Sequence, residues 1–137
     1  MMTAKEYLRQ LKTLDNLINA KLLEKERIRA LATKVTSNLS ERVQGGGFGG
    51  IENTVIKITE LEIQINADID KLVDLKAEAT QIIDSLEDNK HKAILSMYYV
   101  SNLTFEQVAE NTDMTFRWIH KLHGRALKEF EKKYSSS

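Results

Sequence analysis

Apolar residues recur at helical spacing along the first part of the chain. They return in steps of three and four residues, with one gap, at Tyr7, Leu11, Leu14, Ile18, Ile28, Leu31 and Val35. This spacing predicts one long helix with an apolar stripe. Lys21 and Lys25 occupy positions where the repeat favours apolar residues. We therefore expect a polar layer or a local kink near the middle of this helix.

A second long segment has a stricter repeat. Apolar residues are spaced by seven at Ile51, Ile58, Ile65, Leu72, Ala79 and Leu86. Val55, Leu61, Ile69, Leu75 and Ile82 fill the flanking positions and are expected in the same core. A seven-residue repeat indicates a helix that supercoils against a partner. Each segment is about 36 residues, or roughly 54 Å of helix, so we expect residues 1–87 to form an antiparallel hairpin. Pairing of the stripes between chains is the alternative.

The two segments are separated by the glycine-rich sequence QGGGFGG. Glycine is unfavourable in a helix and offers no side chain to pack, so residues 45–50 are expected to form a flexible tip. Glycine-rich loops also bind phosphates. Here no Gly-Lys-Ser/Thr sequence follows and no strand precedes the cluster, so a nucleotide site has no support.

The sequence LEDNK, residues 86–90, is a polar break that ends the long helix and opens a C-terminal unit over residues 88–134. A helix is expected from His91 to Val100. Thr104 then stands three residues before Gln107, which is the spacing of a capping box, so a second helix begins there. It can last only about two turns, because Asn-Thr-Asp follows at residues 111–113 and favours a turn.

Thr115 is the expected cap of a third helix, which runs to Tyr134, and the serines at 135–137 are expected to form a disordered tail. A two-turn helix, a short turn and a longer helix form the helix-turn-helix arrangement. The residues of the third helix expected to pack inward are Ile119, Leu122, Ala126, Leu127 and Phe130. Trp118 is expected to pack at the edge of the unit.

The other side of this third helix is aromatic and basic. With the cap Thr115, the residues that we expect to contact DNA are Phe116, Arg117, His120, Lys121, Arg125 and Lys128. Arg117 and Lys121 are four residues apart and can reach guanine edges or flanking phosphates in a major groove about 12 Å wide. Arg125 and Lys128 suit backbone phosphates. Taken alone, the same face is more typical of a solvated basic helix than of a DNA-binding one. The preceding capped helix and short turn favour DNA binding.

Composition narrows the function further. The chain of 137 residues has no cysteine and no proline, and its basic and acidic residues balance at 20 each. Disulfides, thiolate zinc sites and cysteine nucleophiles are therefore excluded. His120 and His123 are three residues apart, but no further ligand completes a metal site. We expect neither enzyme activity nor a cofactor. With no signal peptide and no membrane-spanning run, we expect a soluble, cytoplasmic, all-α protein.

The segment LTFEQVAENTDMTFRWIHKLHGRALKEF, residues 103–130, resembles the promoter-binding fourth region of bacterial sigma factors. In that family a threonine-capped helix, a turn, a capped recognition helix and a closing Arg-Ala-Leu follow one another. The chain departs from the pattern at Asp113, where a glycine is usual, and at Asn111 and Thr112, which replace apolar residues. Aspartate tolerates the left-handed conformation better than most residues.

The whole chain is similar to small phage-encoded regulators of the autolysin-regulator type. The stretches MTAKEYL, INADIDKLVDLK and RWIHKLHGRAL carry this resemblance. It implies a late-gene transcription regulator of a phage or prophage, associated with the nucleoid of a bacterial host. Phe116, Arg117, His120 and Lys121 then match the base-reading positions.

Two hypotheses follow from the sequence. In the first, the protein binds double-stranded DNA, and a second copy of the chain or RNA polymerase adds affinity and specificity. In the second, it is a coiled-coil structural or interaction protein that binds no DNA. The two differ in whether Arg117 and Lys121 are needed for binding.

Overall fold

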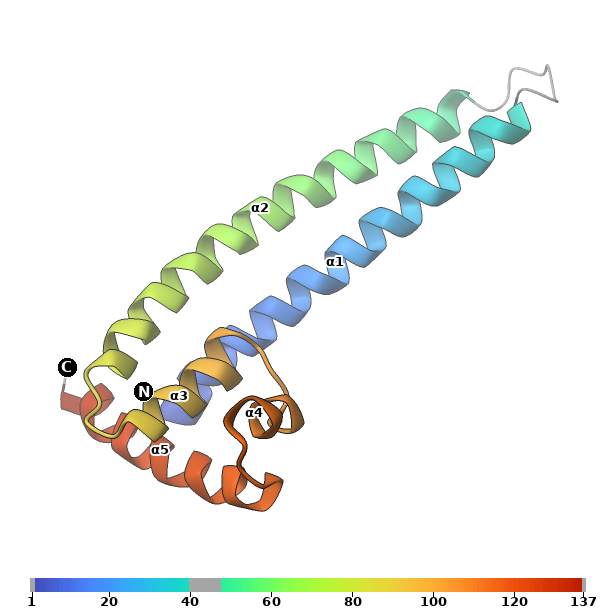
Figure 1. Cartoon of the computed structure of the whole chain (residues 1–137). Helices are drawn as coiled ribbons and strands as arrows, with labels where there is room; N and C mark the ends of the chain where they lie inside the picture. The colour runs from blue at the N-terminus through green and yellow to red at the C-terminus, as the bar shows by residue number, and fades with distance from the viewer. Residues whose placement is uncertain (1, 40–47, 137) are drawn as a thin grey trace. The chain divides into compact units, whose positions relative to one another are not determined.

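In the computed structural model, which describes residues 2–39 and 48–136, the protein is all-α, as the sequence predicts. Its elements are α1 (Ala4–Leu39), α2 (Phe48–Asp84), α3 (Asn89–Leu95), the π-helix η1 (Ser96–Val100), α4 (Phe105–Thr112) and α5 (Phe116–Ser136) (Figure 1). The described residues contain no strand. α1 and α2 have 36 and 37 residues, so the expected pair of long helices of matched length is confirmed. No helix in the described ranges is long and apolar enough to span a membrane.

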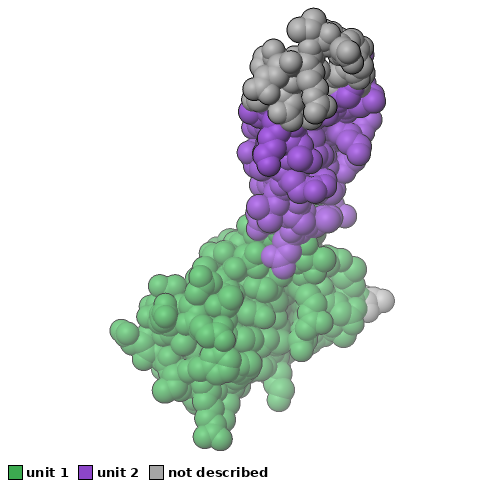
Figure 2. All heavy atoms as spheres, turned by 90° about the vertical axis from the view of Figure 1, so that its right-hand side faces the viewer, with its two compact units in different colours: residues 1–15, 72–137 green, residues 16–71 purple. Residues whose placement is uncertain are grey.

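The chain divides into two compact units, coloured separately in Figure 2. One consists of residues 16–71. The other joins residues 1–15 to residues 72–137, so it contains the first turns of α1 as well as the C-terminal helices. We call the first the hairpin unit and the second the C-terminal unit.

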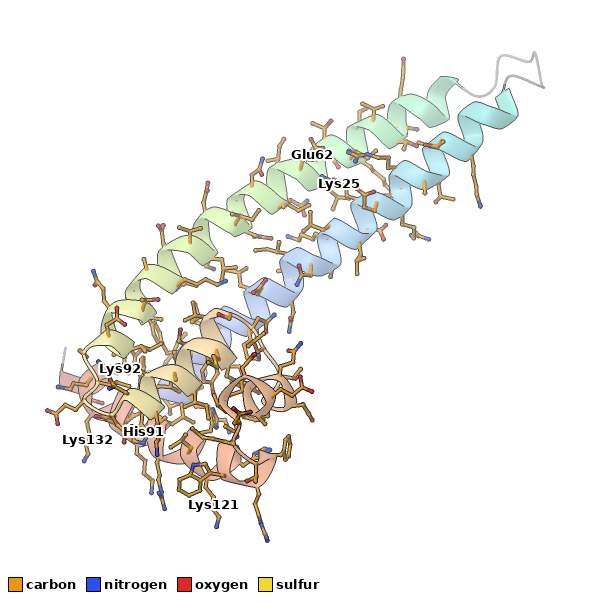
Figure 3. All side chains as sticks on the ribbon, viewed as in Figure 1. Lys25, Glu62, His91, Lys92, Lys121 and Lys132 are labelled. Carbon is orange, nitrogen blue, oxygen red and sulfur yellow. The ribbon has the colours of Figure 1, made fainter. Side chains whose placement is uncertain are left out.

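The hairpin unit consists of antiparallel segments of α1 and α2. Lys21 pairs with Asp68 at 2.6 Å and Lys25 with Glu62 at 3.8 Å, so the numbering rises along one helix as it falls along the other. Figure 3 shows Lys25 and Glu62 reaching toward each other from the two helices. The two lysines that interrupt the apolar stripe therefore form a polar layer, while α1 continues as one helix.

The apolar contact inside the hairpin unit is narrow. Ile18 and Ile65 are its buried apolar residues among those described. The prediction that Val55 and Ile69 pack in the core is wrong, because they are 56% and 40% exposed. Leu31 is also exposed. Two helices meet along a single line of residues, so the flanking positions face outward unless another helix covers them.

The glycine-rich tip is shorter than predicted on one side. Phe48, Gly49 and Gly50 form the first turn of α2, although glycine was expected to exclude helix there. The first turn tolerates poor helix formers better than the interior does, because its N–H groups have no intrahelical partner in any case. Residues 45–47 lie outside the described residues.

The C-terminal unit has a continuous apolar core. Its largest fully buried side chains are Leu8, Leu11, Ile94, Leu95, Val108, Ile119 and Phe130. They come from α1, α3, α4 and α5, so the first helix of the chain contributes to the same core as the last.

The connections within the C-terminal unit follow the expected polar breaks. α2 ends at Asp84 and α3 begins at Asn89, so the first three residues of LEDNK lie between the helices and its last two begin α3. Asp88 caps α3 by accepting the N–H groups of Lys90 and His91. The predicted helix from His91 to Val100 is present as α3 followed by η1. At the other end, Ser135 and Ser136 were expected in a disordered tail but are the last residues of α5.

Candidate nucleic-acid interface

The short helix α4 begins with the predicted capping box. Thr104 has an extended backbone, and its Oγ1 accepts the N–H of Gln107 at 3.1 Å. The side chain of Gln107 accepts the N–H of Thr104 at 2.9 Å in return. α4 then buries Val108 completely. The cap and this buried residue fix where the helix begins and which side faces the core.

The turn between α4 and α5 depends on one left-handed residue. Asp113 follows the end of α4 with φ 55° and ψ 28°, a conformation that most residues with a Cβ avoid and aspartate tolerates. Two residues later, Thr115 Oγ1 accepts the N–H of Trp118 at 3.1 Å and so caps α5. Asp113 thus adopts the left-handed conformation at the position where the sigma-factor family usually has a glycine. Both caps predicted from the sequence, Thr104 and Thr115, are confirmed.

α5 has a buried side and an exposed side. Ile119, Leu122, Ala126 and Phe130 are buried against the rest of the C-terminal unit, and Leu127 is half-buried. The predicted site residues are all exposed: Thr115, Phe116, Arg117, His120, Lys121, Arg125 and Lys128. Lys121 projects outward from α5 in Figure 3. Arg117, Lys121, Arg125 and Lys128 follow one another at steps of three and four residues, so their charges lie on one face of the helix.

The N-terminal end of α5 carries an exposed aromatic surface. The rings of Phe116 and His120 lie 4.6 Å apart, and Phe105 of α4 lies 4.5 Å from His120. Phe105 in turn stacks on Tyr98 at 4.1 Å. Phe116 is thus held in place while 46% of it remains exposed. An aromatic surface beside two cations can contact thymine methyl groups and base edges.

Trp118 and Arg125 form a pair on α5. The guanidinium carbon of Arg125 lies 5.3 Å from the centre of the Trp118 ring, within the range of a cation–π contact. Trp118 is half-buried, consistent with the expected packing at the edge of the unit. Its ring restricts the orientations that Arg125 can adopt.

His123 forms a hydrogen bond inside the C-terminal unit. Its Nε2 lies 2.7 Å from the Tyr99 hydroxyl, and burial, with smaller contributions from Lys5 and His120, lowers the pKa of the imidazole to about 4. At neutral pH the ring is uncharged, and its tautomer decides which of the two groups donates this hydrogen bond. Residues 2–39 and 48–136 contain no group of three potential metal ligands.

The C-terminal half of α5 is fixed by a polar contact with the α2–α3 connection. His91 Nδ1 lies 2.8 Å from Glu129 Oε1, and the N–H of Glu87 donates to Glu129 Oε2 at 3.1 Å. The hydrogen bond from His91 holds the pKa of the Glu129 carboxyl below its usual range. This contact holds α5 in place without involving the basic residues of its exposed face.

The sequence did not reveal that the start of α1 supports α5. Tyr7 stacks on Tyr134 with ring centres 4.8 Å apart, and its hydroxyl donates to Glu78 Oε1 at 2.8 Å. The N–H of Ala4 donates to Glu131 Oε2 at 2.8 Å. Leu8 is fully buried although it lies outside the predicted stripe. The spacing of Ala4, Leu8 and Leu11 was the available signal, because it forms a second apolar stripe beside the first.

Lys12 joins α1 to the segment that precedes α4. Its ammonium group donates to the carbonyls of Tyr98 and Leu103 at 2.9 and 3.2 Å and to Asn102 Oδ1 at 2.9 Å. It also lies 3.9 Å from the centre of the Tyr98 ring. Burial lowers the pKa of this lysine, and the charge of Asp15 partly opposes the shift. Asn102 itself has a positive φ of 56°, so Lys12 stabilises an unusual turn directly before α4.

Comparison with known proteins identifies a family. A family model described as a protein of unknown function, DUF1492, matches residues 32–131. Neither a curated protein nor a solved structure is significantly similar to the chain. The matched residues include most of the hairpin and the helices of the candidate interface. Because they make up more than half of the chain, the protein belongs to the DUF1492 family.

Proposed function

We propose that the protein binds duplex DNA through the N-terminal half of α5 and regulates transcription in a phage or prophage. The observation that carries this proposal is the geometry of α4, its left-handed turn and α5. Two capped helices meet at the turn, and α5 keeps its aromatic and basic residues exposed while its apolar side is buried. A recognition helix needs this combination, because only exposed side chains reach base edges.

The charges on α5 support the same proposal. The protein has no net charge, so its surface as a whole does not attract DNA. Arg117, Lys121, Arg125 and Lys128 nevertheless lie on one face of one helix, and no acidic residue lies between the first and last of them. A local basic face of this kind supplies phosphate contacts and the counterion release that accompanies them. Phe116 and His120, beside these cations, supply groups for base readout.

A small recognition helix buries little area, so another subunit or RNA polymerase is expected to contribute to specific binding. The hairpin unit offers a surface for either partner. Leu23 and Ile63 are 72% and 65% exposed on it. These aliphatic side chains also favour the second candidate function, a coiled-coil interaction protein whose helices bind a partner without DNA.

Fluorescence anisotropy with a labelled, mixed-sequence duplex tests the proposal. The wild type is titrated at several salt concentrations beside Arg117→Ala/Lys121→Ala. We expect binding to weaken steeply with salt and the double variant to lose about 2 kcal/mol or more, roughly thirtyfold in Kd. The matched control is Lys34→Ala/Lys57→Ala, which removes the same charge from exposed positions of the hairpin unit and is expected to bind almost as well as the wild type.

Two results would contradict DNA binding through α5. One is a loss of affinity that is equal in both double variants, because the loss would then come from the change in net charge and not from the position of Arg117 and Lys121. The other is the absence of binding by the wild type even at low salt. The second result would favour the coiled-coil function, and the exposed aliphatic residues of the hairpin unit would then be the surface to test.

A further inference from the structure

Gly124 stands in the interior of α5, eight residues after the start of the helix and twelve before its end. Glycine is among the least favourable residues at such a position, because it loses the most backbone freedom when the helix forms. The basic residues next to it on the same face are Lys121 and Lys128, and both are exposed, as Gly124 is.

Within residues 2–39 and 48–136, no contact requires a glycine at this position. A Cβ built at position 124 would meet no atom within 4 Å, so no neighbouring element requires the missing side chain. None of the described glycines has a positive φ, so the backbone does not require glycine either. A glycine on a helix surface also lets another molecule approach the backbone closely.

The position of Gly124 along α5 indicates which molecule that is. Eight residues of helix correspond to about 12 Å, which is about the width of the major groove. If the first two turns of α5 lie in the groove, the next turn reaches its edge, where the sugar-phosphate backbone lies. Lys121 and Lys128 lie three residues before and four residues after Gly124, so they flank it on the same face of α5. Both cations can therefore bind the phosphates that border the glycine.

We propose that the DNA backbone lies directly against α5 at Gly124, where the missing Cβ lets a phosphate approach the helix between Lys121 and Lys128. This inference rests on the proposed function and adds a steric requirement to it. The contact is with the backbone and so carries no base sequence. It positions the helix and thereby sets how deeply Arg117 enters the groove.

Gly124→Ala separates this requirement from stability. Alanine is the better helix former and has open space at this position, so the unfolding midpoint of the variant should rise by about 2 to 4 °C. Its affinity for the mixed-sequence duplex should nevertheless fall by about tenfold, or about 1.4 kcal/mol. The loss should be similar on duplexes of different sequence. Gly124→Gln, which is larger and still compatible with a helix, should bind more weakly again.

The chain provides a matched control at Gly50. This residue is also an exposed helical glycine, and a Cβ there would also meet nothing within 4 Å, but it lies in α2 of the hairpin unit. Gly50→Ala should keep wild-type DNA affinity. Equal DNA affinity of wild type and Gly124→Ala would overturn the close approach and leave DNA binding through α5 intact. Weaker binding accompanied by a lower unfolding midpoint would also overturn it, because the side chain would then disturb the helix itself. Absence of DNA binding in every variant and in the wild type would remove the proposed function as well.

Discussion

Lys12 makes the clearest quantitative prediction about how the candidate interface is supported. Its ammonium group contacts three oxygen acceptors within 3.2 Å and the face of the Tyr98 ring. Lys12→Met keeps the length and apolar stem of the side chain but removes the charge and its three donors. The substitution leaves two carbonyls and one amide oxygen without this partner, directly before α4.

The expected loss follows from the contacts and the burial. Leaving a buried acceptor unsatisfied costs about 1 to 3 kcal/mol, and two carbonyls lose their donor. The site is only half-buried, so water can replace part of the loss. Removing an ammonium group that burial disfavours also returns some free energy. We therefore expect Lys12→Met to lower the free energy of unfolding by about 2 kcal/mol, which is near the lower end of the combined cost for the two carbonyls.

Urea unfolding followed by tryptophan fluorescence measures this loss. Trp118 is the single tryptophan of the chain, and it lies in the C-terminal unit, so its emission reports on the unit that Lys12 supports. Lys5→Met is the control, since Lys5 is an exposed lysine on the same helix. A loss for Lys12→Met within about 0.5 kcal/mol of that for Lys5→Met would refute the reasoning, because surface substitutions alone fall in that range.

Three further predictions use the same measurement or a proton titration. Thr104→Ala removes the hydrogen bond that Thr104 Oγ1 accepts from the N–H of Gln107 and should lower the free energy of unfolding by about 1 kcal/mol; an unchanged urea midpoint would contradict this. Leu8→Ala should cost about 2 to 5 kcal/mol because its side chain is fully buried, while Leu23→Ala, in the hairpin unit and largely exposed, should cost less than about 0.5 kcal/mol; equal losses would contradict the placement of Leu8. His123 should titrate near pH 4 in the folded protein, as followed by its ring proton signals in NMR spectra. In the unfolded chain the ring takes up its proton near pH 6.5, so the unfolded state binds more protons between these values and stability should fall as pH is lowered through this window. A folded-state pKa near 6.5 would contradict the burial of the ring.

The features that the sequence predicted correctly depend on local rules. A capping box needs only Thr104 and Gln107 at the right spacing, and the cap of α5 needs only Thr115. Asp113 was expected to accept a left-handed conformation, and it does so. The buried side of α5 follows from helical periodicity alone. These elements position the candidate interface, so its exposed residues could be named before the fold was known.

The features that were missed depend on contacts between distant parts of the chain. The spacing of Tyr7, Leu11 and Ile18 fits a helix packed in a hairpin, and it gave no sign that α1 also packs on α5. In the sequence, Lys12 cannot be distinguished from the other charged residues of α1, because its hydrogen-bond acceptors belong to residues 98–103. Val55 and Ile69 fit the heptad, but a pair of helices buries too narrow a stripe to cover them. The sequence alone gives no interpretation of Gly124, since an exposed glycine becomes informative only when its surroundings are known.

The discontinuous C-terminal unit has a consequence for the order of folding. Its core combines Leu8 and Leu11 with residues from Ile94 to Phe130, and residues 16–71 separate the two parts in sequence. The pairing of α1 with α2 is a shorter-range event and lowers the entropy of bringing the distant parts together. Until α5 has been synthesised, the Tyr7 ring cannot stack on Tyr134, and the N–H of Ala4 cannot bind the carboxylate of Glu131. During synthesis, the core of the C-terminal unit therefore stays incomplete until α5 has been made and packs on α1.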